Sequence, residues 1–189
     1  MTANPPELWL IRHGDTVWSE SGRHTGRTDV PLVPSGEDQA RDLAPRLRGH
    51  DFALVLTSPL QRARETARLA GYPDAHVDEN LLEWDYGDYE GLTSDEIRAG
   101  RPGWTIWNGN PPGGETAAHV ETRVRAVIAR CADAAGDALL FAHGHVLRAL
   151  TAVDLGFAVR HGAQFALETA TINVLGHEHA DPALRRWNG

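Results

Sequence analysis

Three short runs of consecutive apolar residues constrain the fold of this chain more than any other feature of its sequence. They cover residues 8–11, 52–56 and 138–142, and a polar residue follows each run directly. Strands of a parallel sheet tend to be apolar throughout, whereas strands of a half-exposed antiparallel sheet alternate between apolar and polar residues. The three runs therefore predict parallel strands that are covered on both faces.

Helical patterns separate these predicted strands. Caps and apolar spacing predict helices that begin near Ser35, Ser58, Thr93, Thr116 and His145 and end near Gly49, Gly71, Gly100, Gly136 and Gly156. Two more strands are predicted at 171–175 and, as an edge strand, at 183–187. Alternating strands and helices are typical of the α/β class. We expect one domain over residues 1–189, with a mostly parallel central sheet, helices on both faces, a long loop at 15–34 and a lid at 92–118.

The charge of the chain limits its partners. Its net charge is −8 at pH 7, whereas proteins that bind nucleic acids or anionic membranes without specificity need a basic face. No stretch approaches the roughly 20 apolar residues of a membrane span, and residues 1–7 lack the basic and apolar regions of a secretory signal. We therefore expect a cytoplasmic protein that binds neither nucleic acid nor membrane.

Missing residue types exclude several chemistries. All 18 Lys+Arg positions hold arginine, so a lysine-dependent phosphate loop and Schiff-base chemistry are excluded. The single cysteine, Cys131, cannot form an internal disulfide and is predicted to be a buried structural thiol. The pairs His143/His145 and His177/His179 could each be half of a metal site, but no His-Glu-x-x-His motif or paired-cysteine spacing accompanies them. We therefore expect no metal and no other cofactor.

Basic residues follow the predicted strands at the points where these strands end. Arg12 and His13 follow the first run, His143 follows the third, and Arg62 lies in the first turn of the helix after the second. Carboxyl ends of parallel strands share one edge of a sheet, where ligands of open α/β sheets bind. Forked guanidinium donors match phosphate oxygens, and imidazole can act as nucleophile or proton donor. An Arg-His-Gly triplet alone favours a structural histidine, so the inference of a catalytic site rests on the whole set.

An acidic and aromatic run covers residues 81–91. Its first carboxylate, Glu83, follows two leucines and precedes a tryptophan. An apolar setting favours the protonated form of a carboxyl group, as a general acid needs. The later acids Asp85, Asp88 and Glu90 are predicted to be solvated or capping groups.

These motifs, taken together, resemble those of a known family. Residues 12–16 read Arg-His-Gly-Asp-Thr, residues 58–67 read Ser-Pro-Leu-Gln-Arg-Ala-Arg-Glu-Thr-Ala, and residues 142–145 read Ala-His-Gly-His. With the run at 83–91, they resemble the histidine phosphatase superfamily, also called phosphoglycerate mutase-like, over nearly the whole chain. The resemblance is to its small bacterial branch, which includes acid phosphatases and sedoheptulose-bisphosphatase-like members.

The resemblance implies roles for individual residues. His13 would be the phosphorylated nucleophile, Glu83 the proton donor, and Arg12, Arg62 and His143 the ligands of the phosphoryl oxygens. Four further positions would contact the substrate in the pocket: Ser19, where many members have asparagine, Thr25, Gly26 and Gly144. Asp15 stands where glutamate is commoner in the family.

The function that the resemblance implies is that of a phosphomonoesterase of the histidine acid phosphatase type, acting on small phosphate esters such as sugar phosphates. We expect His13 to attack phosphorus while Glu83 protonates the leaving oxygen. Water would then hydrolyse the phosphohistidine with Glu83 as base. Two guanidinium groups and a protonated His143 would supply the positive charge that a metal ion supplies in other phosphoryl-transfer sites.

Two alternative functions stay open on the sequence alone. A mutase would use the same phosphohistidine but return the phosphoryl group to a second hydroxyl of the substrate. Mutases of the family carry a longer central insertion with extra basic residues, whereas Arg98 and Arg101 are the only basic residues of 92–118. A non-catalytic phosphate-ester binding protein would have no need of the nucleophile and acid that are present here. The sequence does not set the oligomeric state and allows a homodimer.

Overall fold

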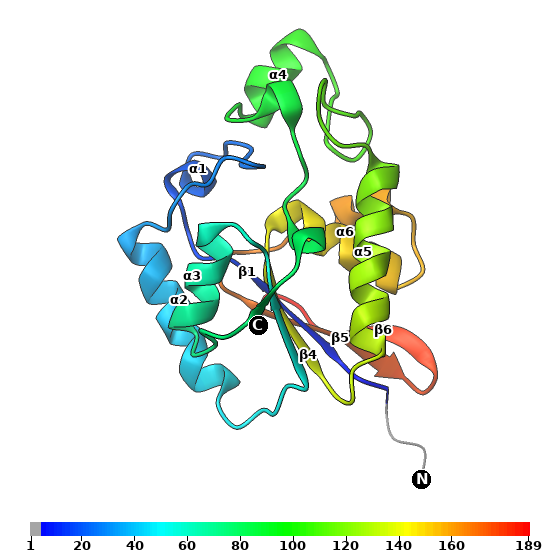
Figure 1. The fold of residues 1–189 in the computed structure, drawn as a ribbon. Coiled ribbons are helices and arrows are strands. Elements are labelled where there is room, and N and C mark those ends of the chain that lie inside the picture. The colour runs from blue at the N-terminus through cyan, green and yellow to red at the C-terminus, as the bar shows by residue number, and fades with distance from the viewer. Residues whose placement is uncertain (1–4) are drawn as a thin grey trace.

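The computed structural model describes residues 5–189 and contains one six-stranded sheet with the order β3-β2-β4-β1-β5-β6 (Figure 1). Residues 1–4, part of the segment inspected for a secretory signal, lie outside the described residues. The first four strands in that order are mutually parallel, and β5 runs antiparallel to both β1 and β6. The predicted mostly parallel α/β fold is confirmed. The strand bounds are β1 Leu8–Arg12, β2 Leu54–Thr57, β3 His76–Val77, β4 Ala138–Ala142, β5 Ile172–Glu178 and β6 Asp181–Arg186.

Helices cover both faces of the sheet. In Figure 1, α2 and α3 lie on one side of the strands, and α5 and α6 lie on the other. The α-helices are α1 Val17–Glu20, α2 Pro34–Leu47, α3 Gln61–Leu69, α4 Ser94–Gly100, α5 Ala117–Ala132 and α6 Gly144–Asp154. Short 3₁₀ helices are η1 Glu79–Leu81, η2 Gly87–Tyr89 and η3 Val159–Gln164.

Two apolar cores, one on each face of the sheet, explain why the strands are apolar throughout. Successive side chains of a strand point to opposite faces. Leu10 accordingly joins the core under α5 and α6, while its neighbour Ile11 joins the core with Leu43 of α2. All five residues of β4 are buried. Both faces of the central strands are therefore unavailable to ligands, which leaves the strand ends as the place for a site.

Three local predictions are wrong. The helices α2 and α3 begin at Pro34 and Gln61, so neither Ser35 nor Ser58 is an N-cap residue. Proline suits the first helical position because its φ is already helical, and this sets the start of α2 without a side-chain cap. The predicted loop at 15–34 contains α1, which Thr16 caps through a reciprocal capping box with Ser19.

The predicted lid begins as expected and stands apart from the sheet. Thr93 caps α4 in a capping box with Glu96, and in Figure 1 α4 lies well above the carboxyl ends of the strands. The backbone of Arg23 pairs with that of Thr93, and the Arg23 guanidinium lies 3.5 Å from the Glu96 carboxylate. The lid is thereby connected to the loop after β1. Among residues 5–189, no helix is long and apolar enough to cross a membrane.

A contact between two glycines brings α2 against the turn that follows β1. A Cβ on Gly36 would lie 2.6 Å from the backbone nitrogen of Asp15 and closer still to its carbonyl oxygen. A Cβ on Gly14 would overlap the carbonyl group of Gly36 in the same way. The turn and the helix can therefore approach this closely only because both residues lack a side chain.

We predict that Gly36→Ala lowers the free energy of unfolding, because the added methyl group pushes α2 away from the turn. Overpacking of this kind costs about 1–3 kcal/mol. Urea denaturation of Gly36→Ala and of Gly100→Ala as a control would test this, since a Cβ on Gly100 meets nothing within 4 Å. Equal stabilities of the two variants would contradict the proposed contact.

Candidate active site

A cavity of about 160 Å³ opens at the carboxyl ends of β1 and β4. Its wall includes residues of the motifs at 12–16 and 142–145, together with Glu83 and Tyr86 of the acidic run. The lining residues are Arg12, His13, Ser19, Gly22, Arg23, His24, Thr25, Glu83, Tyr86, Gly144, His145, Arg148 and Leu167. A larger hollow between α3 and β3 contains none of the predicted site residues. The predicted meeting of strand ends is therefore observed at the smaller cavity.

His13 is held in one tautomer. Its Nδ1 lies 2.8 Å from the carbonyl oxygen of Gly14, which can only accept a hydrogen bond, so Nδ1 carries the proton. Burial, and then the charges of Arg62 and Arg12, lower the pKa of His13 well below its ordinary value. The ring is therefore neutral near pH 7, and its Nε2 keeps the lone pair that a nucleophile needs.

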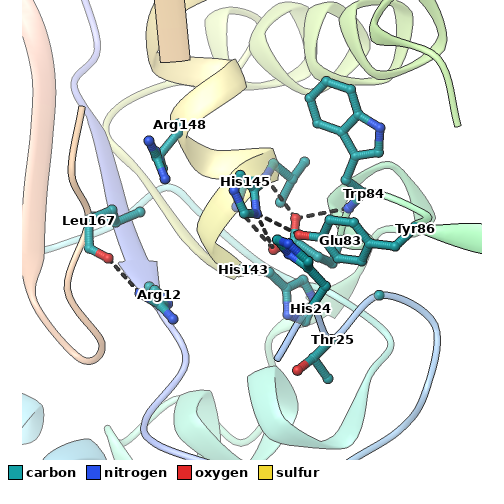
Figure 2. Close-up of polar contacts among 12 residues, drawn as sticks. Arg12, His24, Thr25, Glu83, Trp84, Tyr86, His143, His145, Arg148 and Leu167 are labelled. Atoms are coloured by element: carbon teal, nitrogen blue, oxygen red, sulfur yellow. Dashed lines mark hydrogen bonds and ion pairs between the residues drawn. The ribbon is translucent and has the colours of Figure 1, made fainter. Parts of the chain in front are cut away.

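Arg12 is anchored to a neighbouring loop by one end of its guanidinium group. Its Nη1 donates to the carbonyl oxygen of Leu167 at 2.6 Å, as Figure 2 shows. Its Nε is buried and has no hydrogen-bond partner within the described part of the chain. A buried unpaired donor on a cationic group is costly unless an acceptor satisfies it. Arg12 is therefore prepared to bind an anion in the cavity.

Arg62 and His143 form a second layer behind the cavity wall. The Nε of Arg62 donates to Nδ1 of His143 at 3.1 Å, and His143 Nε2 lies 2.7 Å from the hydroxyl of Ser58. The rings of His143 and His13 are in edge contact, with centroids 5.2 Å apart. Neither Arg62 nor His143 is among the residues that line the cavity. Their direct contact with phosphoryl oxygens stays a prediction.

The predicted protonation of His143 is wrong. Its Nδ1 accepts from the guanidinium of Arg62, which cannot accept a hydrogen bond, so the proton lies on Nε2 and is donated to Ser58. Burial, and then the nearby charges of Arg62 and other basic groups, lower the pKa of His143. His143 is therefore neutral, and the positive charge comes from arginine.

Glu83 lies in the cavity but not in the apolar setting that its sequence neighbours predict. Its carboxylate accepts hydrogen bonds from three backbone N–H groups: those of Trp84 at 2.8 Å, His145 at 3.0 Å and Val146 at 2.8 Å. The last two belong to the first turn of α6, whose N-terminus attracts negative charge. The sequence neighbours gave the wrong environment because α6, which is distant in sequence, supplies the donors.

The four residues predicted to contact the substrate differ in their position and in their hydrogen-bond partners. Thr25 lines the cavity, and Gly144 lines it directly beside Arg12 and Glu83. Ser19 also lines it, but its hydroxyl is engaged with the backbone of Thr16 and lies 3.3 Å from Asp15. Gly26 lies outside the wall, where its carbonyl oxygen accepts from Arg62 and its N–H donates to the carboxylate of Glu90. The carboxylate of Glu90 also accepts from the backbone N–H of Thr28, so this side chain binds the loop and does not cap a helix.

Sequence reasoning missed an aromatic cluster in the wall of the cavity. The hydroxyl of Tyr86 lies 2.5 Å from Nδ1 of His145, and the ring of His24 packs against Tyr86 with centroids 4.7 Å apart. Burial, and then Glu83, raise the pKa of Tyr86, so the phenol is protonated and donates to His145. Burial lowers the pKa of His24 to about 4 and also lowers that of His145. All three side chains are neutral at pH 7.

Two further arginines line the cavity and were also missed. Arg148 lies one turn after His145 on α6, and this spacing is the signal that could have placed it on the same face. Its Nε donates to the carbonyl of Gly162 at 3.0 Å, and its guanidinium lies over the ring of Trp107 at 4.9 Å. Arg23 is anchored on the carbonyl of Gly91 at 2.6 Å.

The cavity is a basic site on an acidic protein. Three arginines and one carboxylate line it, whereas the whole chain carries a net charge of −8. Within residues 5–189, no group of three or more His, Cys, Asp or Glu side chains is arranged to hold a metal ion. His177 and His179 lie in the β5–β6 hairpin. The arrangement therefore suits a nucleophilic histidine acting on an anionic substrate.

Comparisons with known proteins agree with this geometry. Residues 8–189 match the histidine phosphatase superfamily (branch 1). The chain belongs to this superfamily. It is 41% identical over 177 residues to an acid phosphatase of Mycobacterium tuberculosis, which covers 91% of this chain and 87% of that protein. It is 35% identical over 193 residues to sedoheptulose 1,7-bisphosphatase of Saccharomyces cerevisiae, which covers 85% and 71%.

A solved structure shares the fold of this chain. The product of a Mycobacterium tuberculosis open reading frame superposes with a TM-score of 0.93 and 37% identity over 97% of both chains. The resemblance that the motifs at 12–16, 58–67 and 142–145 indicate is thus confirmed over nearly the whole chain.

We predict that His13 stays neutral at pH 6.5, where an unperturbed imidazole is about half protonated. Because burial and two arginines lower its pKa, protonation should begin only at more acidic pH, and activity that depends on Nε2 should persist into that range. Imidazole ¹⁵N NMR, with His13→Gln to assign the signals, measures the two ring nitrogens separately. Two protonated ring nitrogens at pH 6.5 would contradict the assignment.

Proposed function

We propose that this superfamily member is a phosphomonoesterase that hydrolyses small phosphate esters, sugar phosphates among them, through a phosphohistidine on His13. The observation that carries the proposal is the pairing of a neutral His13, whose Nδ1 proton is donated to Gly14, with a basic cavity wall. The phosphatase names of its relatives support the reaction class. The small volume of the cavity, about 160 Å³, supports a small substrate.

In the first step, Nε2 of His13 attacks phosphorus in line with the ester oxygen. A P–N bond forms, the P–O ester bond breaks, and Glu83 delivers a proton to the departing oxygen. The imidazole ring becomes cationic as the P–N bond forms. The carbonyl oxygen of Gly14 stabilises this cation by accepting the hydrogen bond that Nδ1 donates. Arg12 stabilises the equatorial oxygens with its unpaired Nε.

In the second step, water attacks the phosphohistidine. Glu83 takes a proton from the water, the P–N bond breaks, and inorganic phosphate and neutral His13 are released. Glu83 then holds the proton for the next cycle. Because His143 is neutral, the positive charge in both steps comes from Arg12 in the wall and Arg62 directly behind it.

The substrate class follows from Arg148 in the same cavity. Two of its nitrogens donate to backbone carbonyls of the 162–163 turn, which leaves Nη1 for a ligand. The charges of Arg12 in the wall and Arg62 behind it already balance one dianionic phosphate, so a further guanidinium suits a substrate with a second anionic group. The similarity to a protein named sedoheptulose 1,7-bisphosphatase supports a sugar bisphosphate.

The setting of the enzyme is part of the same proposal. We place it in the cytoplasm, acting on a free small molecule without nucleic-acid or membrane partners. The net charge of −8 supports this, because such partners attract basic surfaces. Either a monomer or a homodimer is compatible with the cavity, whose described wall comes from one chain.

We predict that His13→Ala abolishes turnover, because the variant has no nucleophile. An acid-labile, alkali-stable ³²P label from substrate should appear on the wild type and be absent from the variant. EDTA should leave the wild-type rate unchanged, and the products should be inorganic phosphate and alcohol. Label on His13→Ala would disprove the nucleophile, and an isomeric phosphate ester as product would show a mutase.

We predict that Glu83→Gln slows phosphoenzyme formation by about 10²- to 10⁴-fold for a sugar phosphate, since a general acid contributes that much. The loss should be much smaller for p-nitrophenyl phosphate, whose leaving group needs little protonation. Single-turnover rates with both esters separate this step from hydrolysis of the phosphoenzyme. Equal losses for the two esters would mean that Glu83 is not the acid.

We predict that Arg148→Ala lowers kcat/KM for a sugar bisphosphate by roughly 10- to 100-fold, the size of a charge-assisted hydrogen bond. The corresponding monophosphate should lose little, because it has no second anionic group. Arg160→Ala, an exposed arginine of η3, provides the matched control. The proposed substrate class fails if Arg148→Ala impairs both substrates equally.

A further inference from the structure

The segment that carries Glu83 has no α-helix or strand to hold it in place. Residues 82–86 lie between the short helices η1 and η2. A proton donor must lie within hydrogen-bond reach of the leaving oxygen, and a misplacement of about 1 Å can cost 10²-fold in rate. Some other part of the molecule must therefore fix the backbone on either side of Glu83.

Arg123 of α5 holds the residues that precede Glu83. Its Nη1 donates to the carbonyl oxygens of Asn80 at 2.7 Å and Leu82 at 2.8 Å. Its Nε and Nη2 form a two-pronged pair with the carboxylate of Glu115, at 2.6 and 2.8 Å. With a longer bond of 3.5 Å from Nη2 to the carbonyl oxygen of Glu83, five hydrogen bonds fix the guanidinium, which a lysine ammonium could not reproduce in one plane.

Glu115 holds the residues that follow Glu83. Its backbone N–H donates to the carbonyl of Asp85 at 2.9 Å, and its own carbonyl accepts from the indole of Trp84 at 2.9 Å. Its carboxylate also accepts from the backbone N–H of Asp85 at 3.2 Å. The Arg123–Glu115 pair therefore holds the backbone on both sides of Glu83.

The pair is mostly buried, and neither member touches the cavity. The side chains of Arg123 and Glu115 are 14% and 12% exposed, and neither residue lines the site. The helix that carries Arg123, α5, packs along α6, and α6 supplies two of the N–H groups that hold the Glu83 carboxylate. Two packed helices thus fix the backbone and the carboxylate of the same residue.

We propose that Arg123 and Glu115 are positioning residues that hold Glu83 where it can protonate the leaving oxygen. This inference rests on the proposed role of Glu83 as the acid. The pair contacts neither substrate nor nucleophile, so it changes the rate only through the place of Glu83. The pair has this function because its hydrogen bonds fix the backbone before and after Glu83.

The test uses single-turnover phosphoenzyme formation with a sugar phosphate and with p-nitrophenyl phosphate. Arg123→Gln should slow the sugar phosphate about 10-fold or more, leave the aryl ester nearly unchanged and hardly alter KM, since the phosphate ligands are intact. In a Glu83→Gln background, Arg123→Gln should cause no further loss, because both changes remove one function. Glu115→Gln should behave in the same way.

Controls separate positioning from general destabilisation. Arg125→Gln changes an exposed arginine on the same helix whose only ion-pair partner among residues 5–189 is Glu121, and should leave all rates unchanged. Arg123→Lys keeps the positive charge but cannot form the two-pronged contacts. It is the variant to measure if Arg123→Gln does not fold. The lysine variant should show the same preferential loss on the sugar phosphate, at smaller size.

The following results would overturn the inference. Equal losses on both esters, or a further loss in the Glu83→Gln background, would show that the pair acts on the fold as a whole. If Glu83→Gln itself showed the predicted ester dependence while the Arg123 and Glu115 variants did not, the inference alone would fail. If Glu83→Gln slowed both esters equally, the assigned acid would be wrong and the positioning role would fail with it.

Discussion

The hydrogen bond from Nδ1 of His13 to the carbonyl of Gly14 is the interaction on which the rest of the site depends. It places the proton on one ring nitrogen and leaves Nε2 as the nucleophile. Gly14, which lacks a side chain, packs directly against Gly36 of α2, so the turn that carries this carbonyl lies close to the helix. The backbone of His13 is fixed in turn by its N–H bond to Ala142 of β4. The parallel pairing of β1 with β4 is therefore a requirement of the chemistry as well as of the fold.

Burial controls the charge state of the site. Two adjacent imidazoles are kept neutral because they are removed from water and lie beside guanidinium groups. Arg62 is fully buried, yet carbonyl oxygens of the 25–28 loop and the ring of His143 accept four hydrogen bonds from its guanidinium. Arg12 keeps one donor without a partner among the described residues. Positive charge thus stays on groups that cannot lose a proton, and the histidines are free to act as nucleophile and positioning group.

The sequence predicted the elements that depend on local pattern, and it failed where distant segments decide. Buried strands and the Thr93 cap were predicted because apolar runs and capping boxes are local. Ser58 looks like an N-cap residue, but its hydroxyl binds His143, which is 85 residues away in the chain. The sequence around Glu83 predicts an apolar setting, but backbone N–H groups of α6 bind its carboxylate. Arg148 reaches the cavity because α6 packs beside β1. In each case the tertiary packing determines the interaction partner, and no local sequence pattern encodes it.

The central claim is that Nε2 of His13 carries the phosphoryl group. The direct measurement is ³¹P–¹⁵N correlation NMR of the phosphoenzyme, formed on protein with ¹⁵N-labelled histidine and quenched in alkali, with peptide mass spectrometry to locate the residue. The tautomer set by Gly14 predicts phosphorus coupled to Nε2 of residue 13. Phosphorus on Nδ1, on His143 or His145, or on an oxygen of any side chain would contradict the account.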